Sequence, residues 1–199
     1  VDGIICDYNY VFDPNVRLKR YFDQGEPGQG YLFLVDEAHN LVPRAREMYS
    51  ASLIKEDVLM VRRILKSQTG AGKVLTQLDR CNQKFLDIKR AYGSDSGEGV
   101  IHRQVLGSDY ELLPDVNLLA LQLMTMFGEL ESFMNENVEF GDRDLVLDFY
   151  FAVRDFLYVY DRLDDNYRIY ARLLPDGHFM VRLLCMNPAV NLKECLDRG

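Results

Sequence analysis

Cysteine is scarce in this chain of 199 residues, and its spacing excludes two common classes of protein. The four cysteines are Cys6, Cys81, Cys185 and Cys195. No two of them are separated by the two-residue gap that zinc and iron–sulfur sites use. They are also too sparse for the disulfide framework of a secreted domain. We therefore expect a protein of the reducing, cytoplasmic compartment.

Positive charge and long apolar runs are lacking as well. The chain has 23 Lys and Arg against 31 Asp and Glu, a net charge of −8. Because nucleic-acid-binding domains carry clustered basic residues, this balance excludes a broad basic footprint but permits a local basic groove. No uninterrupted apolar run reaches the ~20 residues that cross a bilayer, so we expect no membrane partner. Hydrophobic residues still make up 48% of the chain, enough for a packed core.

A complete phosphate-binding loop is also missing. Such a loop has the pattern G-x-x-x-x-G-K-[ST], and the nearest candidate is SQTGAGKV at residues 67–74. Ser67 stands where the first glycine should be, and Val74 stands where the hydroxyl that binds Mg²⁺ should be. The string also joins two predicted helices, whereas a phosphate cradle joins a strand to a helix. We interpret it as a helix–helix turn.

The most informative feature that is present is the string YLFLVDEAHN at residues 31–40. Its five apolar residues predict a central strand of a parallel sheet, covered on both faces. Asp36 and Glu37 would then emerge at the carboxyl end of the strand, where open α/β sheets bind ligands. Asp36 would anchor a hydrated Mg²⁺ ion that bridges the phosphates of ATP. Glu37 would activate the attacking water, and His39 would relay the nucleotide state to neighbouring motifs.

A second interpretation of the acidic string needs no nucleotide. An aspartate at a helix N-cap followed by a glutamate in the first turn is common, because both acids interact favourably with the free N–H groups there. The apolar run before the acids and the complete Asp-Glu-Ala-His-Asn string favour the nucleotide site.

Four segments after the acidic string have apolar residues at helical spacing: residues 43–68, 73–92, 114–140 and 142–165. In the last of them, apolar residues recur every three or four positions and form one packing stripe. Four helices of this kind predict a bundle.

Shorter elements flank these helices. Residues 3–7 predict a buried strand, and residues 16–22 predict a short helix. Residues 100–113 predict an irregular hairpin. Two strand-like runs joined by Pro-Asp-Gly within residues 167–188 predict a second hairpin, and a last helix begins near residue 191. The fold class is therefore mainly α with α/β, and an interrupted sheet with a helical insertion fits this order of elements.

Three strings together resemble the DinG/XPD-type superfamily 2 DNA helicases. They are ICDYNYVFDP at residues 5–14, LFLVDEAHNL at residues 32–41, and LLCMNP followed by NLKECLDRG within residues 183–199. The long helices between the second and third strings match the family in length, position and helicity alone.

The resemblance implies a domain organisation. Residues 1–42 would belong to the first RecA-like motor domain and include the DEAH box. Residues 43–165 would form a helical insertion like the Arch domain of the family. Residues 166–199 would form a β-hairpin and return to the motor domain.

The resemblance also implies an activity: translocation along single-stranded DNA from the five-prime to the three-prime end, driven by ATP and Mg²⁺. The family's Gly-Lys-Thr loop would lie before Val1 and its second motor domain after Gly199. We therefore expect this chain to be a piece of a longer protein, inactive as an ATPase by itself. The iron–sulfur cluster of many members is left open, because its cysteines would lie upstream. Cys6 is expected to be a small core residue and not a ligand.

Two basic clusters are candidates for contacts with DNA phosphates, since Lys and Arg supply most sequence-independent DNA affinity. They comprise Arg17, Lys19 and Arg20, and Arg62 and Arg63. Solvated helix faces explain them equally well. The alternative function is a free-standing, acidic, helical protein-interaction module in which the DEAH string is incidental.

Overall fold

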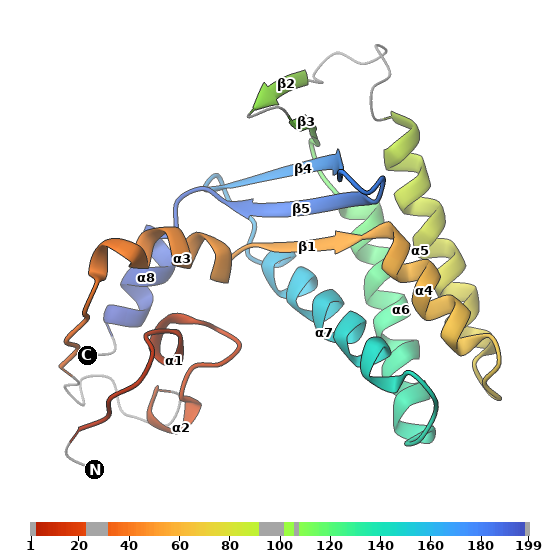
Figure 1. Ribbon diagram of the computed structural model, residues 1–199, viewed down its shortest axis with the longest axis horizontal. Helices are drawn as coiled ribbons and strands as arrows, with labels where there is room; N and C mark the ends of the chain where they lie inside the picture. The colour runs from red at the N-terminus through yellow and green to blue at the C-terminus, as the bar shows by residue number, and fades with distance from the viewer. Residues whose placement is uncertain (1–2, 23–31, 92–101, 106–107, 198–199) are drawn as a thin grey trace. The chain divides into compact units, whose positions relative to one another are not determined.

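The computed structural model describes residues 3–22, 32–91, 102–105 and 108–197, with the backbone alone for residues 102–105, 108 and 109. The chain divides into two compact units (Figure 1). Unit 1 comprises Val1–Ser50, Asp165–Tyr167 and Leu184–Gly199, and unit 2 comprises Ala51–Asp164 and Arg168–Leu183. The domain boundaries that the resemblance implies stay a prediction.

The core of unit 2 is a four-helix bundle. Its helices are α4 (Lys55–Leu65), α5 (Gly72–Ala91), α6 (Asn117–Glu136) and α7 (Arg143–Tyr160). Helix α4 packs on α5, α5 on α6, α6 on α7, and α7 packs back on α4, a ring that can be followed in Figure 1. The buried residues of α7 recur every three or four positions, as one apolar stripe requires. The predicted bundle is confirmed.

The prediction of one long helix over residues 43–68 is wrong. The segment forms α3 (Leu41–Met48), then strand β1 (Ala51–Ile54), and only then α4. Strand β1 pairs antiparallel with β5 (Phe179–Cys185), and the pairing buries Leu53 to 3% exposure. The pairing of β1 with β5 therefore outweighs the local helical preference of this segment, which amounts to about 0.5 kcal/mol per residue.

Five strands are assigned among the described residues, in the order β1-β5-β4-β3-β2. The bounds of the remaining three are His102–Val105 for β2, Ser108–Leu112 for β3 and Tyr167–Leu173 for β4. Strand β3 pairs antiparallel with both β2 and β4. In the β4–β5 hairpin, the N–H of Leu174 donates to the carbonyl of His178 at 2.8 Å. Both predicted hairpins are confirmed, but the described pairings are antiparallel where the sequence predicted a parallel sheet.

The two predicted buried strands near the start of the chain are also wrong. Neither residues 3–7 nor the described residues 32–35 form a strand. A strand needs a neighbour to satisfy its N–H and C=O groups, and no described segment pairs with either. Their apolar side chains are exposed instead: Ile5 to 104%, Leu32 to 86% and Leu34 to 89%.

Unit 1 is organised around the side chain of Tyr49. Its helices are α1 (Asn9–Phe12), α2 (Lys19–Phe22), the 3-10 helix η1 (Ala38–Asn40), α3 and α8 (Ala189–Leu196). The Tyr49 hydroxyl donates to the carbonyl of Phe12 at 2.7 Å and lies 3.6 Å from the Sγ of Cys195. All three residues are buried. Three segments far apart in the sequence therefore meet at one hydroxyl group.

Replacing Tyr49 with Phe should lower the free energy of unfolding by about 1 kcal/mol, because the Phe12 carbonyl would stay buried without this donor. Urea unfolding followed by circular dichroism measures the change. Tyr10→Phe is the matched control, since Tyr10 is 44% exposed in the same unit. Equal stability of the Tyr49→Phe variant and the wild type would contradict the assigned role.

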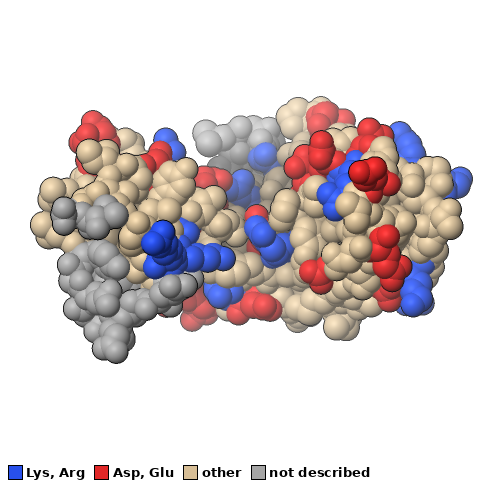
Figure 2. All heavy atoms as spheres, turned by 90° about the horizontal axis from the view of Figure 1, so that it is seen from below, with Lys and Arg blue, Asp and Glu red and all other residues tan. Residues whose placement is uncertain are grey.

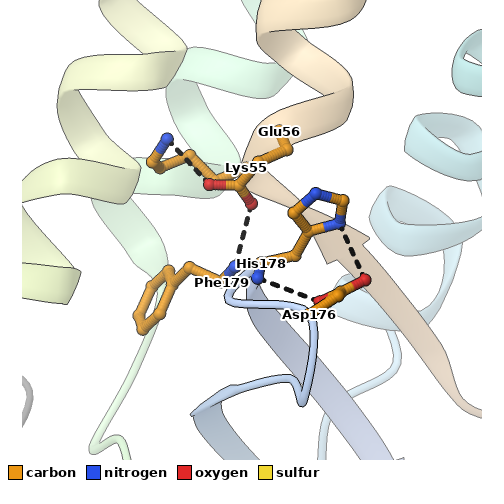
Figure 3. A network of polar contacts seen from close by, with 5 residues as sticks. All are labelled: Lys55, Glu56, Asp176, His178 and Phe179. Atoms are coloured by element: carbon orange, nitrogen blue, oxygen red, sulfur yellow. Dashed lines mark hydrogen bonds and ion pairs between the residues drawn. The ribbon is translucent and has the colours of Figure 1, made fainter.

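A polar network holds the start of α4 against the β4–β5 hairpin in unit 2 (Figure 3). The Nζ of Lys55 lies 3.0 Å from Oε1 of Glu56, and Oε2 of Glu56 accepts the N–H of Phe179 at 2.8 Å. In the hairpin turn, Asp176 accepts the N–H of His178 at 3.0 Å and lies 3.2 Å from its Nδ1. Glu56 thus joins a buried lysine to the backbone of β5.

The network moves the pKa values of two carboxyl groups in opposite directions. Burial by itself raises the pKa of Glu56, but the N–H of Phe179 and the charge of Lys55 outweigh it, so the pKa is lowered. Burial raises the pKa of Asp57, partly offset by His178. A lowered pKa means that Glu56 stabilises the fold above its unfolded-state pKa, and that this contribution is lost as the pH falls through the folded-state value.

Glu56→Gln should therefore reduce stability by about 1 kcal/mol near neutral pH, and the difference from wild type should shrink at about pH 3. Urea unfolding at both pH values tests this. Glu139→Gln is the control, because Glu139 is exposed. A stability loss that is the same at both pH values would show that the charge of Glu56 is not its cause.

Candidate functional site

The acidic string of residues 36–40 forms a turn that leads into a helix. The Oδ1 of Asp36 accepts the N–H of Glu37 at 2.8 Å. Glu37 has a φ of 50°, in the left-handed region that residues other than glycine rarely adopt. Its carbonyl accepts the N–H of Asn40 at 2.9 Å and so begins η1, which runs into α3. Neither η1 nor α3 has a side-chain N-cap bond, so the helix-cap interpretation of the two acids gains no support.

The functional groups of this turn face solvent. The Nε2 of His39 lies 3.3 Å from Oε2 of Glu37, with side-chain exposures of 74% and 65%. Asp36 is exposed too. The structure therefore brings Asp36, Glu37 and His39 together, but in a turn that follows no strand. The predicted position at the rim of a sheet is not formed by the described residues.

The two carboxylates have the donor type that suits Mg²⁺. This ion takes oxygen ligands, keeps several waters, and is usually held by one or two carboxylates together with substrate phosphates. Within the described ranges, no three His, Cys, Asp or Glu side chains gather into a group that could hold a metal ion. Asp36 and Glu37 therefore fit Mg²⁺ that arrives with phosphates, and do not form a metal cage by themselves.

The string at residues 67–74 lies between α4 and α5, which confirms the helix–helix turn. Gly70 has a φ of 83°, a conformation that glycine adopts without strain. Lys73 already lies in the first turn of α5. The chain thus supplies no strand-to-helix phosphate cradle at this position.

A groove in unit 1 lies between the first of the strings that carry the family resemblance and helix α3. It is lined by Asn9, Asp13, Pro43, Arg44, Glu47 and Met48. The Arg44 guanidinium lies 5.4 Å from the centre of the Tyr8 ring, a cation–π geometry. The segment of residues 5–14 therefore lies beside the helix that follows the DEAH box. Sequence reasoning missed Arg44, because nothing in its spacing distinguishes it from other surface cations.

The cysteines differ sharply in exposure. The prediction that Cys6 is a core residue is wrong, because its side chain is exposed. It lies in one of the two predicted strands that do not form. Cys81, Cys185 and Cys195 are buried, and burial raises the pKa of the Cys81 thiol to about 12. Thiolate chemistry is therefore suppressed at Cys81.

Iodoacetamide should alkylate Cys6 in the native protein and leave Cys81, Cys185 and Cys195 unmodified until urea unfolds the chain. Peptide mass spectrometry distinguishes the four sites. The Cys6→Ser variant should show no rapid modification. Rapid native labelling of Cys81 would contradict its burial.

The predicted DNA-contacting residues lie in two separate helices. In α2, Lys19 and Arg20 are exposed, whereas Arg17, just before it, is half-buried. In α4, Arg63 is exposed. The Nε and Nη2 of Arg62 both donate to the carboxylate of Asp79, Nη2 at 3.2 Å. This pair raises the pKa of Arg62 and occupies its donors.

The surface of the bundle does not favour DNA on the face drawn in Figure 2. Basic and acidic side chains are interspersed over the helices there, without a continuous basic area. Because Asp79 also binds Arg62, the α4 cluster is better explained as a solvated helix face. The α2 cluster stays a candidate.

In the part of the chain that the structure describes, no helix combines the length and the apolar character needed to cross a bilayer. A comparison of the chain with protein-family models gives no match, and a comparison with curated protein sequences also gives none.

Proposed function

We propose that this chain is part of an ATP-dependent DNA helicase of the DinG/XPD type. In this proposal unit 1 carries the acidic half of the ATP site, and unit 2 is the helical, Arch-like insertion of a RecA-like motor domain. The complete protein would translocate on single-stranded DNA.

One observation carries the proposal. The first two strings and all of the third except Leu183 fall in unit 1, although the third lies far from the other two in the sequence. Phe12 of the first string and Cys195 of the third both contact the hydroxyl of Tyr49, which directly follows the helix that starts at the end of the second. A chance occurrence of three short motifs would give no reason for them to pack together.

The exposed apolar side chains of unit 1 agree with a surface that packs against another segment. Burying a Leu or Ile side chain contributes roughly 1.5–3 kcal/mol, so Ile5, Leu32 and Leu34 leave several kcal/mol of potential stabilisation unused. In the proposed motor these exposed side chains would pack against further segments of the same protein.

The chemistry follows from the residues of the turn. Bound Mg²⁺ supplies charge neutralisation at the phosphates. Asp36 would hold the hydrated ion, and Glu37 would orient the attacking water and accept its proton. His39, 3.3 Å from Glu37, senses the state of that carboxylate and transmits it to neighbouring segments.

The chain alone should not hydrolyse ATP, because it lacks the phosphate loop. In the protein extended by its flanking genomic sequence, Glu37→Gln should reduce turnover by about a hundredfold or more while ATP binding is retained. Glu47→Gln, ten positions along the same segment, is the matched control and should keep its turnover. Release of phosphate from ATP measures the rate.

Two results would contradict the proposal. One is turnover by the chain alone that disappears on Glu37→Gln, because the missing loop would then be unnecessary. The other is an extended protein whose turnover is unchanged by Glu37→Gln. Reading the flanking sequence for a Gly-Lys-Thr loop before the chain and a Ser-Ala-Thr-Leu type string after it is an independent check.

The alternative of a helical protein-interaction module is favoured by one feature of α6. Leu118 and Leu121 are 67% and 65% exposed, one helical turn apart, and Met124 extends the row at 40%. Exposed apolar rows of this kind occur at protein interfaces. The row is compatible with both functions, since an insertion in a motor domain can also bind a partner.

A further inference from the structure

The antiparallel sheet of unit 2 has two chemically different faces. On β5, Phe179, Val181 and Leu183 are fully buried. Leu53 of β1 and Ala171 of β4 are buried in the same way. Because successive side chains of a strand point to opposite faces, the residues between them form a second face, which we call the outer face.

The outer face is basic and aromatic. At the described positions within unit 2 it carries Ser52 and Ile54 on β1, Tyr110 and Leu112 on β3, Arg168, Tyr170 and Arg172 on β4, and Met180 and Arg182 on β5. Three of these nine residues are arginines and two are tyrosines, and none is acidic. This is the reverse of the whole chain, whose net charge is −8.

Three arginines surround one tyrosine on this face. The hydrogen bonds at the two ends of the β4–β5 hairpin, Leu174 to His178 and Met186 to Asn166, place Tyr170 opposite Arg182. Arg168 and Arg172 lie two residues to either side of Tyr170, so each is a diagonal neighbour of Arg182, about 7–8 Å away.

A second aromatic ring adjoins this group. The rings of Tyr110 and Tyr170 meet edge to face, with centroids 5.6 Å apart. Arg168 is exposed, and the other arginines and both tyrosines are half-buried. The Nε of Arg172 is buried and has no hydrogen-bond acceptor among the described residues. A buried donor without an acceptor is costly, and a phosphate oxygen would satisfy it once the Arg172 side chain turns outward.

The chemistry of the outer face fits one class of ligand. Proteins that bind single strands combine cations that follow the phosphates with aromatic rings on which bases stack. A duplex hides its base faces, and a run of Asp and Glu side chains offers no ring to stack on tyrosine. Asp176, in the hairpin turn, places negative charge at one end of β4, away from Arg168 and Tyr170.

We propose that the outer face binds single-stranded DNA, with Arg168, Arg172 and Arg182 on the phosphates and Tyr170 stacked on a base. The choice of DNA rests on the proposed function, and the site itself rests on the sheet. The basic clusters that the sequence singled out, in α2 and α4, are not part of this site.

Fluorescence anisotropy with a labelled oligothymidylate of about 15 nucleotides, without ATP, measures the binding. The Arg168→Ala, Arg172→Ala, Arg182→Ala triple variant should bind at least about tenfold more weakly at low salt, and its log–log salt slope should fall by about 2, since each single-strand phosphate contact contributes about 0.7. Circular dichroism confirms that each variant is folded. The single variant Arg168→Ala, at the exposed position, should lower the slope by about 0.7 and keeps the test valid if the triple variant does not fold.

Tyr170→Leu separates stacking from charge. It should weaken binding by about fivefold or more, with an unchanged salt slope, because base stacking is worth roughly 1–3 kcal/mol and releases no counterions. The control Arg62→Ala, Arg63→Ala should bind like the wild type, since the first of these cations is occupied by Asp79.

Four results would overturn the proposal. The first two are no binding by the wild type at low salt, and a loss of affinity in the Arg62 and Arg63 control equal to that in the outer-face variants. The other two are an Arg168→Ala variant whose affinity and salt slope are both unchanged, and binding of oligouridylate that is much tighter than binding of oligothymidylate. An extended protein with no ATP turnover but intact outer-face binding would reject the motor and keep the site. An extended protein with ATP turnover but no outer-face binding would keep the motor and reject the site.

Discussion

The pairing of β1 with β5 is the contact on which the structure of unit 2 depends. Ala51 lies opposite Leu183 and Ile54 opposite Met180, so two segments from opposite ends of the unit are joined by a ladder of backbone bonds. This ladder places Leu53 in the core against α7 and brings Glu56 within hydrogen-bonding distance of the N–H of Phe179. It also sets Ser52 beside Arg182 and so completes one row of the outer face. Without the pairing, the bundle would lack the sheet that covers it.

The sequence could predict those elements whose structure depends on residues that are close together in the chain. The bundle helices and both hairpins have local signals: apolar residues at helical spacing, or two strand-like runs around a turn. Strand β1 has no such signal, because its state is decided by β5, far away in the sequence. The wrong strands at residues 3–7 and 32–35 have the converse cause. Their local pattern is that of a strand, but β structure needs a neighbour, and the described residues provide none.

The same distinction between local and long-range information explains which parts of the candidate site the sequence could predict. Asp36, Glu37 and His39 were identified from the string alone, and a string is local information. The left-handed backbone of Glu37 could not be predicted, because glutamate has no preference for that conformation. A non-glycine residue in that region costs on the order of 1–3 kcal/mol and persists only where the surroundings impose it. A left-handed backbone occurs at two described residues other than glycine, Glu37 and Asp142. Asp142 lies at the start of α7, outside the candidate site, so this conformation by itself does not mark a functional residue. Arg44 and the outer face were missed because their partners come from other segments, although Arg168, Tyr170 and Arg172 do alternate at strand spacing.

An acidic protein can present a DNA-binding face because electrostatic forces act over different distances for different groups. At physiological ionic strength the Debye length is about 8 Å, so carboxylates elsewhere on the surface are largely screened from a strand at the outer face. In the proposed complex the three arginines would be in direct contact with the strand and would be screened much less. Net charge therefore governs how often DNA approaches, and local geometry governs whether it stays. An arrangement of this kind favours a strand that is delivered by another part of the protein over one captured from solution. If the proposed function holds, weak and local binding of this kind would let the strand be released at each step of translocation.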